Sequence, residues 1–321
     1  MTLDRARDAL RHLFAGAEDS QDGVDDTKEM AIVDPAGPDA IDKGPVPSTH
    51  DLQVGIASDP GRIRDHNEDA SLAWHFVLAQ LGRPPLHVGL FIVADGMGGH
   101  ARGEQASALA IRTVAAHVIQ SVNLPLLVSE DGTPGSEPIH DILADGMRMA
   151  HEVVAQRLPE AGTTLTMALV LGDGAYIAHV GDSRAYQGER GRLTLLTQDH
   201  SVAARLLEMG HASPEEVASQ RNILYRALGQ GVQVEPDILY HDLSWGQYLL
   251  ICCDGLWGKV TDAEIAAIID NAPTPDLACQ ALVKLANQNG GEDNISVVLA
   301  ARGWPLPDRE AVESPPAEEG A

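Results

Sequence analysis

Aspartates stand at the ends of apolar, strand-like runs, and this placement constrains the fold more than any other feature of the sequence. Asp95 follows the run 87–94 and Asp254 follows the run 247–253. Asp293 opens the run 294–300, and Asp182 comes just after the run that ends at residue 180. A carboxylate at the end of a buried strand is costly unless a positive charge meets it. The pattern therefore indicates a metal site.

The residues beside these aspartates favour a hard divalent cation. Asp95 opens the glycine-rich turn 95–100, and Asp254 is followed by Gly255. Glycine lets a backbone oxygen approach an ion closely, and Mg²⁺ and Mn²⁺ prefer oxygen ligands. A single Asp-Gly after a strand is more often an ordinary turn, which is our interpretation of Asp173. The repeated placement of Asp95, Asp254 and Asp293 is what favours a site.

A second polar cluster spans residues 64–69. Glu68 and Asp69 are adjacent carboxylates that would add a metal contact, and Arg64 would form a bidentate clamp for phosphate. Read alone, such a run is usually a solvated loop.

Strand-like and helix-like runs come in blocks instead of strict alternation. Helical periodicity is expected over 103–121, 139–158, 262–269 and 275–287. Strands are expected over 52–58, 87–94, 163–171, 175–180, 184–187, 193–197, 234–241, 247–253 and 294–300. Short turns at 172–174 and 187–191 favour antiparallel pairing. The sequence therefore predicts an α+β fold in which antiparallel sheets are covered by helices.

Composition excludes several classes of function. A formal net charge of -25 lacks the basic footprint of a nucleic-acid-binding protein. No stretch reaches about 18 consecutive apolar residues, so we expect no membrane insertion. Acidic residues near the N-terminus argue against a signal peptide. We interpret Cys252, Cys253 and Cys279 as buried, reduced thiols, and these features together predict a cytoplasmic protein.

The chain divides into three parts. Residues 1–48 form an acidic, mostly disordered extension with a short amphipathic helix near the start. We expect the ordered domain over 49–302 and a disordered acidic tail over 303–321.

At this point the sequence resembles the metal-dependent protein phosphatase family, type 2C, in its bacterial form. The resemblance covers residues 51–301, and its motifs occur in the order that the family has. They are Arg-x-x-Asn-Glu-Asp at 64–69, Val-Ala-Asp-Gly-Met-Gly-Gly-His at 93–100, Gly-Glu-x-Ala-Ser at 103–107, Gly-Thr-Thr-Leu at 162–165, Val-Gly-Asp-Ser-Arg at 180–184, Thr-Gln-Asp-His-Ser at 197–201, Arg-Ala-Leu-Gly at 226–229, Asp-Gly-Leu at 254–256 and Asp-Asn-Ile at 293–295.

The resemblance implies a four-layer α-β-β-α sandwich with a two-metal centre of Mn²⁺ or Mg²⁺ at one end. By the family's pattern, Asp95 bridges both ions and the carbonyl of Gly96 joins it. Asp254 and Asp293 bind one ion. The other ion faces the pair Glu68 and Asp69, which remain alternatives. Asp182 matches the position linked to a third, weaker ion in bacterial members, and Arg64 matches the arginine that receives the substrate phosphate.

One position departs from the animal members of the family. They carry a histidine proposed as general acid where this sequence has Met97, and nothing in the sequence gives that role to His100. Residues 200–233 resemble the flap, the variable segment beside the metal centre that shapes substrate choice. His211 within it is read as a surface histidine.

The expected activity is hydrolysis of phosphoserine and phosphothreonine in proteins by a metal-activated water, without a protein nucleophile. The expected partners are phosphorylated proteins and, by resemblance, a serine/threonine kinase of the eukaryotic type, with the phosphatase itself a monomer. Two alternatives stay open. The first is a catalytically silent scaffold, which should have lost metal carboxylates, and the second is a phosphohydrolase that acts on small molecules.

Overall fold

The computed structural model describes residues 52–79, 84–98, 101–129, 135–210, 212–213, 216–217 and 223–306. The predicted N-terminal helix, the acidic linker up to residue 48 and the tail beyond residue 306 lie outside the described residues, as do His100 and His211.

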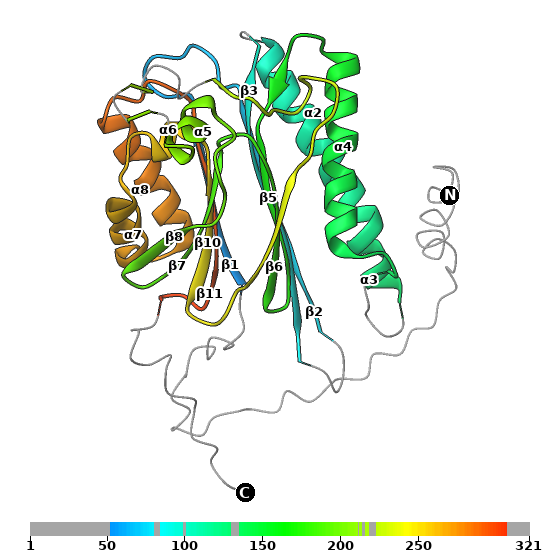
Figure 1. Cartoon of the computed structure of the whole chain (residues 1–321). Coiled ribbons are helices and arrows are strands. Elements are labelled where there is room, and N and C mark those ends of the chain that lie inside the picture. Colours follow the sequence, from blue (N-terminus) through cyan, green and yellow to red (C-terminus); the bar gives the residue numbers. More distant parts are fainter. Residues whose placement is uncertain are drawn as a thin grey trace, which may run out of the picture. The chain divides into compact units, whose positions relative to one another are not determined.

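Two antiparallel sheets form the centre of the domain (Figure 1). The first sheet has the order β1-β11-β10-β7-β8. Its strands are β1 (Leu52–Asp59), β11 (Ile295–Arg302), β10 (Gln247–Cys252), β7 (Arg184–Glu189) and β8 (Arg192–Leu195). The first and last strands of the domain, β1 and β11, pair along their full length, from Leu52 opposite Arg302 to Asp59 opposite Ile295. This pairing holds the two ends of the described domain next to each other.

The second sheet has the order β2-β3-β5-β6-β9, with the short β4 paired to β3. Its strands are β2 (Asp69–Leu78), β3 (Leu86–Met97), β4 (Gly162–Thr163), β5 (Leu165–Leu171), β6 (Gly174–Val180) and β9 (Asp237–Asp242). The predicted hairpin at 172–174 joins β5 to β6, and Leu171 pairs with Gly174 across it.

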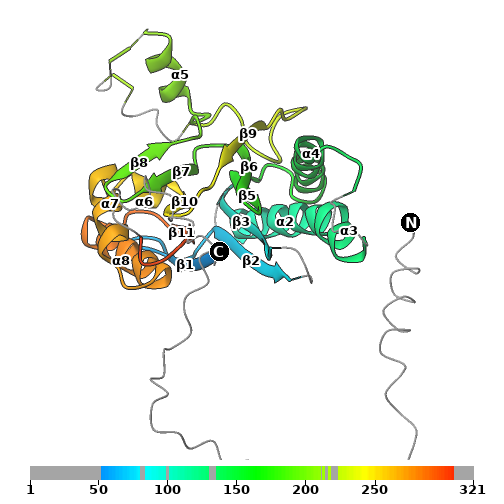
Figure 2. The same ribbon diagram turned by 90° about the horizontal axis from the view of Figure 1, so that it is seen from below.

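Helices cover the outer face of each sheet, which gives four layers (Figures 1 and 2). The second sheet is covered by α2 (Ala101–Val118) and α4 (Ile139–Arg157), with a π-helical turn (Ile119–Asn123) and α3 (Leu124–Val128) between them. The first sheet is covered by α7 (Asp262–Asn271) and α8 (Pro275–Gln288). Two shorter helices, α5 (Val202–Glu208) and α6 (Asp254–Trp257), lie in connections.

Three apolar clusters hold these layers together. One lies between α2, α4 and the second sheet, and contains Leu90, Val114 and Met147. A second lies between α7, α8 and the first sheet, and contains Ile265, Leu282 and Leu299. The third lies between the two sheets, where Phe91, Ile177, Ile251 and Val298 are among its members. The predicted antiparallel sheets covered by helices are confirmed.

The predicted boundary between strand and turn at Asp95 is wrong, because β3 continues through Asp95 to Met97. Asp254 begins the short helix α6, which the sequence did not indicate. The edge strand β2 was not predicted either. Most of its residues are only partly buried, so it lacks the clear alternation that marks a half-buried strand.

The segment Arg102–Val128 is long and apolar enough to cross a membrane by length and composition alone, with a hydropathy of 1.3. In the folded domain, however, residues of α2 such as Ala106, Ala110 and Val114 are fully buried against the second sheet. About 39% of the apolar window is buried inside the domain, and a single helix of this kind is weak evidence for a membrane span.

All three cysteines are free and buried, as predicted. Burial raises the pKa of the Cys252, Cys253 and Cys279 thiols above the ordinary range. They are therefore poor nucleophiles.

The contact between β1 and the start of α8 leaves no room for a side chain at Gly55, where an added Cβ would lie 2.3 Å from the backbone of Pro275. We predict that Gly55→Ala lowers the free energy of unfolding by about 1–3 kcal/mol, the usual cost of overpacking. Urea denaturation measures it. Gly135→Ala is the matched control, because its Cβ would meet nothing closer than 3.9 Å. Equal stability of the two variants would contradict the packing argument.

Candidate metal centre

The candidate residues lie around one pocket at an end of the sandwich. It has a volume of about 330 Å³, and its lining includes Arg64, Glu68, Asp95, Gly96, Asp182, Asp254 and Asp293. Of the eight candidate site residues, Asp69 alone is not among the residues that line the pocket. It lies buried at the start of β2, where its Cα pairs with that of Asp95 on β3.

The two sheets contribute from opposite sides. Asp69 and Asp95 belong to strands of the second sheet, while Asp254 and Asp293 flank β10 and β11 of the first. Asp182 lies in the connection that leaves β6 and enters β7, so it joins the two sheets. Candidate residues that are distant in sequence thus lie near one another, because the strand ends that carry them are at the same end of the sandwich.

Backbone contacts fix the position of Asp95. Its amide donates to the Thr164 hydroxyl at 2.9 Å. Its carbonyl accepts from the Thr163 hydroxyl at 2.8 Å and from the Thr164 amide at 2.8 Å. The Gly-Thr-Thr motif therefore holds the backbone of the aspartate from both sides, which explains why these threonines are needed in this place.

The backbone at Gly96 is in close contact with two other segments, the start of α2 and the loop that carries Glu68. A Cβ at Gly96 would lie 2.1 Å from the Gly103 carbonyl at the start of α2 and 2.6 Å from the Glu68 carbonyl. A Cβ at Gly103 would lie 2.9 Å from the Glu68 carboxylate. The Ser107 hydroxyl donates to the Glu68 carbonyl at 2.7 Å. Only glycine fits at Gly96, where the contacts are with backbone atoms, while a side chain at Gly103 would displace the Glu68 carboxylate.

Asn294 anchors the loop that carries Arg64 and Glu68. Its side-chain oxygen accepts from the Glu68 amide at 2.8 Å. Its side-chain nitrogen donates to the Pro60 carbonyl and the His66 carbonyl, both at 2.9 Å. Asn294 belongs to the Asp-Asn-Ile motif at 293–295, but no role was predicted for it from the sequence. The signal that points to one is an amide side chain next to Asp293 at the start of a buried strand.

The guanidinium of Arg64 donates to the Asp293 carboxylate at 2.7 Å, and its side chain is 51% exposed. The arginine therefore has a fixed backbone and a side chain that reaches into the mouth of the pocket. Met97 lines the pocket as well.

Burial and mutual repulsion disturb the ionisation of the carboxylates. Burial, with help from Asp254 and Asp293, raises the pKa of Asp69 to about 7. Burial, with help from Asp254, raises the pKa of Asp182 to about 8. The pKa of Asp254 rises to about 6, and that of Asp95 rises well above its ordinary value, also mainly by burial. Such groups need a cation to be ionised together near neutral pH.

The residues fit divalent cations. Both carboxylate oxygens of Asp69 and one of Asp254 are buried and lack a hydrogen-bond partner in the described part of the chain. Among the described residues, no group of three or more His, Cys, Asp or Glu side chains lies close enough together to hold a metal ion without other ligands. The carboxylates instead stand around the wall of the pocket, as expected for hard cations that keep several waters.

Comparisons with known proteins agree with this arrangement. A family model described as protein phosphatase 2C matches residues 64–295. The serine/threonine phosphatase Stp of Listeria innocua is 35% identical over 262 residues, which cover 81% of this chain and 100% of that protein.

Two solved structures are similar in fold and sequence. The serine/threonine phosphatase of S. agalactiae matches with a TM-score of 0.64 and 32% identity, over 78% of this chain and 99% of that chain. The catalytic domain of the phosphatase PstP, solved in complex with two manganese ions, matches with a TM-score of 0.62 and 32% identity, over 78% and 97% of the two chains.

We predict that Asp254→Asn stabilises the protein in EDTA at pH 8. A raised pKa means that the native state holds its proton more tightly than the unfolded state, so ionisation at high pH costs native stability. Asparagine removes that cost, on the order of 1–3 kcal/mol, because one unit of pKa corresponds to about 1.4 kcal/mol.

Thermal unfolding with and without Mn²⁺ checks this prediction. Saturating Mn²⁺ should reverse the order, because the wild type binds the ion more tightly and is stabilised by mass action. Asp145→Asn, at an exposed ion pair on α4, is the control and should change little. A less stable Asp254→Asn protein in EDTA would contradict the repulsion argument.

We also predict that Asn294→Ala weakens Mn²⁺ binding by roughly 10–100-fold, the usual cost of losing a group that orients ligands. Isothermal titration calorimetry measures it. Asn289→Ala is the control, because its amide donates to a single backbone carbonyl, that of Lys259, away from the pocket. If both variants bind Mn²⁺ like the wild type, the loop does not depend on Asn294.

Proposed function

Because this chain belongs to the protein phosphatase 2C family of metal-dependent serine/threonine phosphatases, we propose that the pocket lined by Arg64, Asp95 and Asp254 is its catalytic centre. The enzyme hydrolyses phosphoserine and phosphothreonine in proteins and uses Mn²⁺ or Mg²⁺. The observation that supports the location is the meeting of both sheets' buried carboxylates at one pocket.

By the family's pattern, we propose which residues would hold the metal ions. Asp95 and the carbonyl of Gly96 would be shared by two ions, Asp254 and Asp293 would hold one of them, and Glu68 or Asp69 would hold the other. Asp182 would hold a third, weaker ion. The unpartnered oxygens of Asp69 support a role for this residue, while the exposure of Glu68 to the pocket supports the alternative.

Bound ions supply an activated water and neutralise charge on the transferred phosphoryl group. The protein's own residues position the substrate. The guanidinium of Arg64 has the planar geometry that binds two phosphate oxygens at once. Its exposed side chain can move from Asp293 to a phosphate without moving the loop, because Asn294 fixes the backbone.

No side chain of the described residues is needed as a nucleophile. Cys252 and Cys253 are buried with raised pKa values, and neither lines the pocket. Direct attack by water on the phosphorus is therefore the proposed route, without a phosphoenzyme.

The retained carboxylates argue against the catalytically silent scaffold, which should have lost one or more of them. The substrates are phosphorylated proteins. We propose that a serine/threonine kinase of the eukaryotic type supplies them, and that the enzyme acts in cytoplasmic signalling as a monomer. The predicted boundary at residue 302 is too early, because Trp304 and Leu306 are buried in the apolar cluster of the first sheet. We further propose that residues 49–306 form the catalytic domain and that the acidic segments outside it are not needed for catalysis.

We predict that the full chain releases phosphate from a phosphothreonine peptide with Mn²⁺ and not with excess EDTA. Asp95→Asn should lower kcat by at least about a thousandfold and leave the fold intact, because it removes the ligand shared by both ions. Phosphate release and circular dichroism measure the two effects.

The same assay with nucleotides and sugar phosphates tests the remaining alternative. Faster turnover of these compounds than of the peptide would favour a phosphohydrolase that acts on small molecules. A folded, Mn²⁺-loaded protein without turnover of any of them would restore the scaffold hypothesis.

A further inference from the structure

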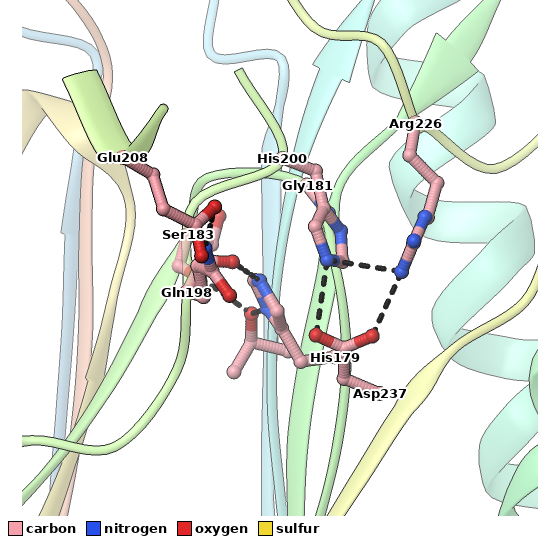
Figure 3. A network of polar contacts seen from close by, with 9 residues as sticks. His179, Gly181, Ser183, Gln198, His200, Glu208, Arg226 and Asp237 are labelled. Atoms are coloured by element: carbon pink, nitrogen blue, oxygen red, sulfur yellow. Dashed lines mark hydrogen bonds and ion pairs between the residues drawn. The ribbon is translucent and has the colours of Figure 1, made fainter. Parts of the chain in front are cut away.

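His200 lies at a junction between the candidate metal centre and the flap (residues 200–233). It follows β8 and comes two residues before α5, and its side chain is only 2% exposed. Figure 3 shows its ring between Gly181, Arg226 and Asp237. These partners come from the connection that carries Asp182, from the end of the flap and from β9.

The backbone of His200 joins two segments that line the pocket. Its amide donates to the Gly181 carbonyl at 2.7 Å, and its carbonyl accepts from the Tyr225 amide at 2.9 Å. The next residues continue the second contact, because Ser201 forms a bridge with Leu224. Leu224 and Asp182 both line the metal pocket. His200 is therefore hydrogen-bonded to Gly181, which precedes Asp182, and to Tyr225, which follows Leu224.

The ring of His200 holds the same glycine a second time. The Gly181 amide lies 3.1 Å from Nδ1 and can only donate, so Nδ1 accepts and carries no proton. Gly181 has a φ of +115°, and a Cβ there would lie 2.5 Å from the Thr164 side chain. Gly181 thus has a backbone conformation that only glycine adopts easily. His200 forms hydrogen bonds with both the N–H and the C=O of Gly181.

The other ring nitrogen is fixed by charged groups. Nε2 lies 3.1 Å from the Asp237 carboxylate, which also accepts from Arg226 at 2.8 Å. Arg226 approaches Nε2 to 3.0 Å. Burial and Arg226 lower the pKa of His200 against the opposing effect of Asp237. A neutral ring with its hydrogen on Nε2 satisfies both Gly181 and Asp237. In that tautomer Nε2 cannot accept from Arg226, so Asp237, which accepts from both side chains, is the group that orients the ring.

We propose that His200 is a positioning residue that sets the Gly181–Asp182 backbone and transmits the position of the flap to the metal centre. The ring takes its orientation from Asp237 on β9, whose carboxylate also accepts from Arg226 in the flap, and through Nδ1 it passes that orientation to Gly181. The carbonyl of Asp182 accepts from the Trp257 indole at 3.0 Å, so this peptide is held from the other side as well. The proposal rests on the proposed function in that Asp182 is taken as a metal ligand.

Two substitutions separate the two ring nitrogens. In His200→Asn the amide oxygen can take the place of Nδ1 and keep the bond from Gly181, while the link to Asp237 is lost. In His200→Gln the amide nitrogen can take the place of Nε2 and keep the link to Asp237, while the acceptor for Gly181 is lost. His151→Gln is the matched control, because His151 Nδ1 accepts from the Gly229 amide at 3.2 Å and lies away from the metal pocket.

The full chain is tested by hydrogen exchange at Gly181, by Mn²⁺ calorimetry and by the Mn²⁺ dependence of phosphopeptide turnover. In His200→Gln we expect faster exchange at Gly181 and a loss of roughly 10–100-fold in affinity for the weakest Mn²⁺. His200→Asn should protect Gly181 like the wild type and bind Mn²⁺ more tightly than His200→Gln. His151→Gln should leave both properties unchanged.

Equal behaviour of His200→Asn and His200→Gln, or unchanged exchange at Gly181 in His200→Gln, would overturn the proposal. If His200→Gln does not fold, Asp237→Asn is the second variant. It keeps the His200 ring and removes the charge that orients it, and we expect a several-fold weaker affinity for Mn²⁺. Unchanged Mn²⁺ binding in that variant would overturn the coupling to the flap.

These outcomes are distinct from failure of the proposed function. Exchange at Gly181 and Mn²⁺ binding do not depend on which substrate is turned over. An Asp182→Asn protein that binds as many Mn²⁺ ions as the wild type would refute the role of Asp182, while the exchange result would still report on His200.

Discussion

The burial of neighbouring carboxylates is the constraint on which the rest of this structure depends. Asp69, Asp95 and Asp254 lie at the end of a sandwich whose core is apolar, and burial, with a smaller contribution from the other carboxylates, raises the pKa of each. Such an arrangement costs stability unless cations offset it. The domain therefore has its most costly electrostatic feature at the candidate metal centre, where polar contacts to the backbone hold the carboxylates in place.

Those contacts are made mainly by backbone groups and short side chains. Thr163 and Thr164 hold the backbone of Asp95, Asn294 holds the loop before Glu68, and Trp257 holds the carbonyl of Asp182. None of them has to contact a substrate. Their effect is to fix the peptide planes from which the ligands project, so that the ligand side chains lose little freedom when an ion binds.

The fold class and the grouping of the candidate residues could be predicted because they depend on local patterns. Apolar runs ending in aspartate predict both the buried strands and the carboxylates, and the two outer helix pairs follow from their periodicity. The order of the motifs then identifies the family. Seven of the eight candidate residues line one pocket, and Asp69 lies buried next to Asp95.

Other features depend on contacts between distant residues, which a single sequence does not reveal. The strand β2 is a partly exposed edge strand, so its pattern is weak. The helix α5 lies within the flap and has only 7 residues, so its apolar residues do not form a helical pattern long enough to recognise. His200 meets Arg226 and Asp237 only after the chain has returned through the flap to β9. Nothing in the spacing of these three residues indicates that they touch.

The apolar layer between the two sheets has a consequence for how such an enzyme can change. Because the candidate ligands come from both sheets, the packing of Phe91, Ile177 and Val298 between the sheets sets how those carboxylates lie relative to one another. A change of side-chain volume in that layer would shift the candidate ligands of one sheet relative to those of the other. The interior of the sandwich therefore affects the geometry of the candidate metal centre as well as the stability of the domain.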